Sequence, residues 1–97
     1  MEFTLKENET ALTVVLNGEL DSISSPDVEE ELFPLMEKKA FETVIFDCTD
    51  LSYIASSGIR ILFTILQKGC RVVIKNANEM LRSVLDSTGL ASVFEFE

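Results

Sequence analysis

Apolar and polar residues alternate near the start of the chain. The alternation over Phe3–Leu5 and Leu12–Leu16 predicts two strands, joined by a polar turn into an antiparallel hairpin with one buried face. Gly18 is expected to end the second strand. Further on, Thr43–Phe46 is β-branched and apolar, which predicts a central strand that is covered on both faces.

A helical spacing of apolar residues follows the hairpin. Ser25 suits the N-cap of this first helix and Pro26 suits its first position. The apolar stripe consists of Val28, Leu32, Leu35 and Met36. Pro34 lies inside this stripe, where it removes one helical hydrogen bond, so we expect it to kink or split the helix.

The second half of the chain continues with helix and strand. A helix is predicted over Ser57–Gln67, ended by Gly69, and a strand over Cys70–Ile74 follows it. Val93–Phe96 predicts a short last strand. Right-handed crossovers through the first two helices would make three strands parallel. Residues 1–97 are therefore predicted to form a single α/β domain with a mixed, mostly parallel sheet, an antiparallel N-terminal hairpin and about three helices.

The third helix carries signals at both of its ends. Asn76 with Glu79 three positions later resembles a capping box. Gly89 suits a left-handed position after the helix, where Leu90 would pack on Leu85. The expected buried stripe is Met80, Leu81, Val84 and Leu85.

The charge balance limits the classes of partner. Seventeen acidic and eight basic residues give a net charge of −9, which disfavours nucleic acid and anionic lipid because both bind basic patches. The excess of acidic residues favours solubility, or steering toward a basic partner surface. No apolar run is long enough to span a membrane and no signal peptide opens the chain, so we expect a cytoplasmic protein without membrane insertion.

The types of residue present also argue against catalysis. The sequence has no histidine, which removes the commonest general base and the usual nucleophile pairs. Cys48 and Cys70 fit neither a CxxC redox motif nor a zinc site, and both are predicted to be small core residues. We expect no catalytic residue, no metal and no cofactor.

The polar turn after the central strand is the leading candidate for chemistry. Ser56 and Ser57 lie at or just before a helix start, where unpaired backbone N–H groups favour a negative group. Phosphorylation of either serine would add about −1.5 to −2 charge at pH 7, which the helix dipole tolerates. The alternative is that both serines only cap the helix.

Two neighbouring features could extend this site. Asp21, Ser22 and Ser24 close the first strand-to-helix turn, which would lie beside the serines if the two strands are neighbours. Either capping or a share in the same surface would explain them. The helix from Ile59 to Leu66 is apolar nearly all round, so either neighbouring helices cover it or an apolar strip adjoins the serines.

Five motifs occur in the order in which a known family carries them. They are Gly18-Glu19-Leu20-Asp21, Asp47 with Leu51–Ile54, Ser56–Leu62, Asn76–Met80 and Thr88–Leu90. Together they resemble the STAS domain of the stand-alone, anti-sigma factor antagonist type, and they cover essentially the whole chain. Ala55 departs from this family, which frequently has aspartate, and sometimes serine, at that position.

The resemblance implies a bacterial regulator in a partner-switching circuit. Its unphosphorylated form binds an anti-sigma factor that is also a serine kinase, which frees the sigma factor. The kinase phosphorylates the second serine of the turn, here Ser57, with Ser56 as the second candidate, and a PPM-type serine phosphatase reverses the step. The partner-binding residues expected on this basis are Asp21, Ser22, Ser24, Ser56, Ser57, Gly58, Ile59, Arg60, Ile61 and Phe63.

Two other functions stay open on the sequence. One is a permanent STAS subunit of a larger assembly, such as a lipid-transport complex, in which the serines only cap the helix. The other is a small enzyme that uses Cys48 or a serine as nucleophile, although no base–nucleophile pair is visible.

Overall fold

A computed structural model gives the fold of residues 1–89 and 91–97. The elements are β1 (Glu2–Glu7), β2 (Ala11–Leu20), α1 (Ser25–Lys38), β3 (Thr43–Ile54), α2 (Ser56–Gln67), β4 (Arg71–Lys75), α3 (Glu79–Ser87), a 3-10 turn (Ala91–Val93) and β5 (Glu95–Phe96). This order confirms the predicted succession of strands and helices. None of these helices is long and apolar enough to cross a membrane.

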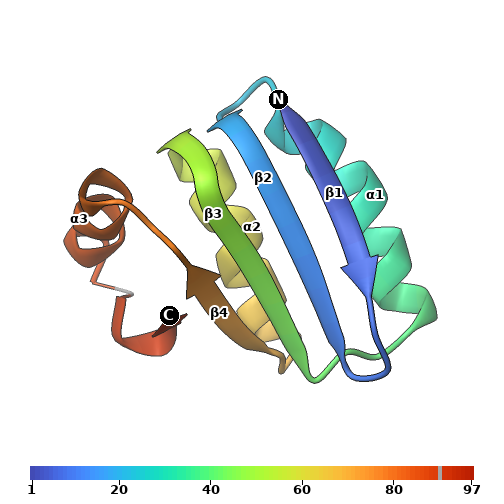
Figure 1. The fold of residues 1–97 in the computed structure, drawn as a ribbon. Helices are drawn as coiled ribbons and strands as arrows, with labels where there is room; N and C mark the ends of the chain where they lie inside the picture. The colour runs from blue at the N-terminus through green and yellow to red at the C-terminus, as the bar shows by residue number, and fades with distance from the viewer. Residues whose placement is uncertain (90) are drawn as a thin grey trace.

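The strands form a single sheet in the order β1-β2-β3-β4-β5. β1 pairs with β2 antiparallel, and β2, β3 and β4 are parallel, as the hairpin and the two crossovers predicted. β5 also pairs parallel with β4. Figure 1 shows α1 and α2 behind the sheet and the opposite face of the sheet without a helix. The fold is therefore a mixed sheet with its helical layer on one side.

The core lies between the sheet and this helical layer. Along β3, Val44 and Phe46 are buried whereas Thr43 and Ile45 are half-exposed. The prediction that this strand is covered on both faces is wrong, because the first two helices pack on the same face (Figure 1). The buried helical residues that face the sheet include Val28, Leu32, Ile61, Leu62, Ile65, Leu81 and Leu85.

Two strands are longer than predicted. β2 continues through Gly18 to Leu20, with irregular register on either side of the glycine, whose φ is +109°. β3 continues past its apolar segment to Ile54, because its backbone stays paired with β2 as far as the Leu20–Ile54 pair. The two strands therefore end side by side, which brings the turns that follow them together.

The start of α1 and its proline differ from the prediction. Ser24 occupies the N-cap and Ser25 is the first helical residue, one position earlier than expected. The helix runs unbroken through Pro34, so the predicted split does not occur. Pro34 is exposed, so solvent can satisfy the carbonyl group that loses its helical donor.

α3 begins later than predicted. Asn78, not Asn76, is the N-cap, and its side chain accepts a hydrogen bond from the Leu81 N–H at 2.8 Å. Asn76 instead takes a left-handed conformation with φ of 59°. Met80 is 48% exposed and does not belong to the buried stripe. Gly89 is left-handed as predicted, with φ of 75°, and the Leu90 contact lies outside the described residues.

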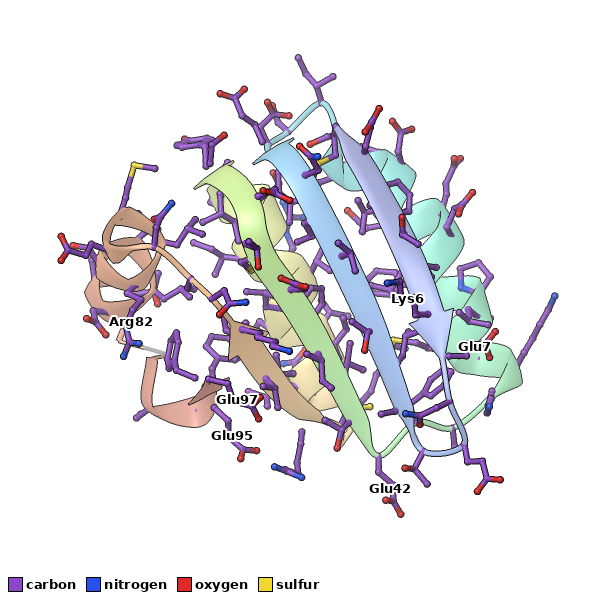
Figure 2. The ribbon with its side chains drawn as sticks, viewed as in Figure 1. Lys6, Glu7, Glu42, Arg82, Glu95 and Glu97 are labelled. Carbon is purple, nitrogen blue, oxygen red and sulfur yellow. The ribbon has the colours of Figure 1, made fainter. Side chains whose placement is uncertain are left out.

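The C-terminal segment is fastened to β4 and α3. Arg71 and Glu95 form a salt bridge of 2.7 Å, and the Arg82 guanidinium lies 4.5 Å from the centre of the Phe96 ring. Figure 2 shows Arg82 on α3, with Glu95 and Glu97 at the C-terminal end of the chain. The predicted short last strand is confirmed only over Glu95–Phe96, because Val93 belongs to the preceding 3-10 turn.

Candidate functional site

The two strand-to-helix turns that follow β2 and β3 lie next to each other. The Ala55 N–H donates to the Leu20 carbonyl at 2.8 Å, which ties the second turn to the end of β2. A Cβ on Gly58 would lie 2.8 Å from side-chain carbons of both Ile54 and Leu20. The start of α2 thus packs directly on the two strand ends, and the predicted neighbourhood of the two turns is confirmed.

The second turn presents its serines without using them as caps. Ala55 is the N-cap of α2 and makes no side-chain capping bond, while Ser56 and Ser57 are the first two helical residues. The Gly58 and Ile59 N–H groups bond to the Ala55 carbonyl at 3.0 and 3.1 Å. Capping therefore does not explain the two serines.

The two serine hydroxyls have different surroundings. Ser57 is half-buried and its Oγ accepts a hydrogen bond from Ser25 Oγ at 3.2 Å. Ser56 is exposed, and its hydroxyl bonds to no other residue in the described part of the chain. α2 has no acidic residue in its first turn, so no carboxylate offsets the positive end of its dipole. A negative group on either hydroxyl is favoured at this place.

The first turn uses its polar groups to hold its own backbone. Asp21 Oδ1 accepts the N–H groups of Ile23 and Ser24, both at 3.0 Å. The Ser24 N–H, and next that of Ile23, lower the pKa of the Asp21 carboxyl by stabilising its ionised form. Ser24 Oγ donates to the Glu19 carbonyl at 2.7 Å. Asp21 and Ser24 thus stabilise the backbone of the turn, while Ser22 is exposed.

α2 offers a narrower contact surface than its composition predicted. Ile61 is buried in the core and Ile59 is half-buried, because α1 and the sheet cover most of the apolar helix. Of the two alternatives that the sequence left open, coverage by neighbouring elements therefore holds, and the exposed apolar strip does not. Arg60 and Phe63 remain exposed, and with Ser56 they occupy positions i, i+4 and i+7 on one side of the helix. Gly58 and Ile61 shape the site from beneath and do not face solvent.

Two exposed apolar residues near the ends of the two strands were not predicted from the sequence. Ile23 is 84% exposed in the first turn, and Tyr53 is 45% exposed near the end of β3. Ile23 was detectable, because it is the one apolar residue inside the polar run Asp21–Pro26. Tyr53 could not be assigned to either face while the strand was expected to end earlier. Exposed apolar side chains next to polar groups are typical of a protein-binding surface.

The cysteines and the core offer no comparable site. Burial raises the pKa of the Cys48 thiol to about 12, so this group is a protonated thiol at neutral pH rather than a nucleophilic thiolate. Cys48 and Cys70 are both buried, as predicted. A cavity of about 10 Å³ in the core is lined by apolar residues and Cys48. No group of three metal-ligating side chains occurs among residues 1–89 and 91–97.

Comparison with known proteins places this fold and turn in one family. Residues 2–97 match the family model of the STAS domain. The chain belongs to the STAS domain family. Structural likeness agrees, since the unphosphorylated form of the anti-sigma factor antagonist SpoIIAA superposes with a TM-score of 0.87 at 21% identity, covering 99% of this chain and 88% of that one.

Two relatives resemble the sequence over nearly its whole length. The anti-sigma-B factor antagonist of Bacillus subtilis (strain 168) is 32% identical over 95 residues, covering 94% of this chain and 85% of that protein. The anti-sigma F factor antagonist of Paenibacillus polymyxa is 24% identical over 97 residues, covering 96% and 83%. A phosphorylated form of SpoIIAA also shares the fold, with a TM-score of 0.78 at 21% identity and coverage of 99% and 91%.

Proposed function

We propose that this STAS domain is a non-catalytic anti-sigma factor antagonist that is switched by phosphorylation of Ser57. The observation that carries the proposal is the position and environment of the Ser57 side chain. It is half-buried at the start of α2, it does not cap the helix, and no acidic side chain shares its turn. Two relatives with coverage above four fifths in both directions bear the name of antagonist, which supports the same role.

The unphosphorylated surface is suited to a protein partner. It combines the exposed Ile23 of the first turn with Ser56, Arg60 and Phe63 on the outer side of α2. We name these four residues the turn surface. Apolar side chains surrounded by small polar groups can be desolvated at low cost when a partner covers them.

Phosphorylation would change this surface without unfolding it. A phosphate on Ser57 would face the unpaired N–H groups at the start of α2, which stabilise negative charge. The same phosphate would place roughly −1.5 to −2 charge at pH 7 inside the contact area, where a bound partner would have to desolvate it. The phosphorylated protein would therefore keep its fold and lose its partner.

The proposed partners follow from this cycle. The binding partner is an anti-sigma factor with serine kinase activity, which transfers the γ-phosphoryl group of ATP, and a PPM-type serine phosphatase restores the hydroxyl. The use of ATP places the cycle in the cytoplasm. Neither nucleic acid nor direct membrane insertion has a part in it.

The proposal is tested by affinity capture from a lysate of the source cell in the presence of ADP, with three baits. Wild type and Ser57→Ala should both retain a protein with a kinase domain. Ser57→Asp should retain at least tenfold less, because its charge lies in the contact area. Ser83→Asp, at an exposed position of α3, is the matched control for added charge and should bind like wild type.

The alternative outcomes separate the remaining functions. Equal retention of the kinase by wild type and Ser57→Asp would contradict the switch. Co-purification with membrane components that is insensitive to Ser57→Asp would support a permanent subunit of a larger assembly. Both outcomes would leave the STAS fold unaffected.

A further inference from the structure

One hydrogen bond reaches the Ser57 hydroxyl from another helix. Ser25 Oγ donates to Ser57 Oγ at 3.2 Å, across 32 positions of sequence. Ser25 is 1% exposed, whereas Ser57 is half-buried. The donor therefore approaches the acceptor hydroxyl from inside the protein and leaves its outer side open.

Ser25 is held in place by the first turn. It is the first residue of α1, and its N–H donates to the Asp21 carbonyl at 2.9 Å. The preceding residue, Ser24, is fixed by its own bond to the Glu19 carbonyl. Within the described residues, Ser57 is the hydrogen-bond partner of the Ser25 hydroxyl. A hydroxyl that is held in place and bonds to Ser57 is suited to orienting the Ser57 hydroxyl.

The second turn itself lacks a side chain that could orient the Ser57 hydroxyl. Ala55 carries no polar side-chain atom, and Ser56 is exposed and does not bond to its neighbour. The N–H of Ala55 donates to the Leu20 carbonyl, which holds the turn that carries Ser57 beside the end of β2. The orientation of the Ser57 hydroxyl thus depends on the first turn.

We propose that Ser25 is a positioning residue for phosphorylation of Ser57, an inference that rests on the function proposed above. The Ser25 hydroxyl occupies one lone pair of Ser57 Oγ, which leaves the second lone pair free to attack the γ-phosphorus of ATP. The Oγ–P bond forms, the bond from the γ-phosphorus to ADP breaks, and the Ser57 proton passes to a base of the kinase. Holding the nucleophile in one orientation raises the rate of such a transfer.

The position of Ser25 separates this role from partner binding. Because the residue is 1% exposed, its side chain cannot contact the kinase in the bound complex. Ser25→Ala should therefore leave the affinity for the kinase unchanged and slow only the chemical step. A residue that merely supported the turn would change binding and catalysis together, or stability alone.

The experiment measures steady-state phosphorylation of wild type, Ser25→Ala and Ser25→Cys by the captured kinase. Both variants should lower kcat by a factor of roughly two to ten, the range that one neutral hydrogen bond supports, at unchanged KM. The cysteine fills the same space but is a weak donor, so it tests the bond rather than the packing. Ser87→Ala, which removes a hydroxyl bonded to the Val84 carbonyl of α3, should behave like wild type.

Each result supports or overturns the inference. An unchanged kcat in Ser25→Ala, or a kcat restored by Ser25→Cys, would overturn it while leaving the Ser57 switch in place. An increase in KM at constant kcat would assign Ser25 to binding instead. Failure of the wild type to accept phosphate would remove the proposed function itself, and that result is visible without any variant.

Discussion

The two strand-to-helix turns follow the neighbouring parallel strands β2 and β3, but their polar side chains make different hydrogen bonds. In the first turn, Asp21 and Ser24 bond to nearby backbone groups and so fix their own loop. In the second turn, Ala55 is the N-cap and neither serine hydroxyl bonds to its own turn. The polar groups of the first turn therefore stabilise its own backbone, whereas the serine hydroxyls of the second turn do not, which leaves them available for the proposed phosphorylation. The Ser25–Ser57 bond joins the two.

The largest effect on stability should come from the residue that brings the turns together. Gly58→Ala places a methyl group 2.8 Å from carbons of Ile54 and Leu20, so the strand ends must move. We expect the free energy of unfolding to fall by about 1–3 kcal/mol, as for other overpacked positions. Chemical denaturation measures this. Ser56→Ala is the control at a neighbouring exposed helical position, and an equal loss in both variants would contradict the packing argument.

A smaller effect should distinguish the serines of the two turns. Ser24→Ala removes the donor to the Glu19 carbonyl and the acceptor of the Asp21 N–H in a buried setting, which should cost about 1–2 kcal/mol of folding free energy. Ser56→Ala should change stability by less than about 0.5 kcal/mol, as is usual for exposed positions without special contacts. Thermal unfolding of both variants compares them. This distinction between the two turns is wrong if Ser56→Ala is the more damaging change.

The smallest expected effect is the contribution of the Asp21 carboxyl to the pH dependence of stability. Hydrogen bonds from the N–H groups of Ser24 and Ile23 lower the pKa of Asp21 in the folded protein. The carboxylate therefore stabilises the fold above its unfolded pKa, about 3.9, and this contribution is lost as pH falls through the folded pKa. Asp21→Asn should be less stable than wild type at neutral pH, and the difference should shrink below about pH 4.

Asp50→Asn is the matched control for the loss of one exposed carboxylate. Asp50 is exposed on β3, and its side chain makes no hydrogen bond within residues 1–89 and 91–97. The free energy of unfolding of this variant at pH 7 should therefore stay within about 0.5 kcal/mol of the wild-type value. A constant difference between wild type and Asp21→Asn at all pH values would show that ionisation of Asp21 does not support the turn.

Much of the fold could be predicted from local sequence signals. The alternation in the hairpin and the two crossover helices predicted the directions of the first four strands correctly. The errors lie where tertiary pairing overrode local signals. Gly18 and the polar residues after Phe46 were expected to end their strands, but parallel pairing with a neighbour carried both strands onward.

The candidate site was chosen from the sequence, but the arrangement of its residues could not be predicted. The position of the serines after a central strand and before a helix identified the turn. That Ala55 would be the N-cap, and that Ser25 would reach Ser57, depends on how far β2 and β3 extend before they turn. The exposure of Ile23 depends on the same geometry. A contact between two turns that are 32 positions apart, such as the Ser25–Ser57 bond, leaves no periodic pattern in the sequence.

The most direct test of the account is to map the phosphate. The purified protein is incubated with the captured kinase and ATP, and peptides covering Ser56 and Ser57 are fragmented by mass spectrometry, together with those covering Ser22, Ser24 and Ser25. The account predicts one phosphate, on Ser57, and none in the first turn. A phosphate on Ser56 or on any serine of the first turn, or no phosphate at all, would contradict it.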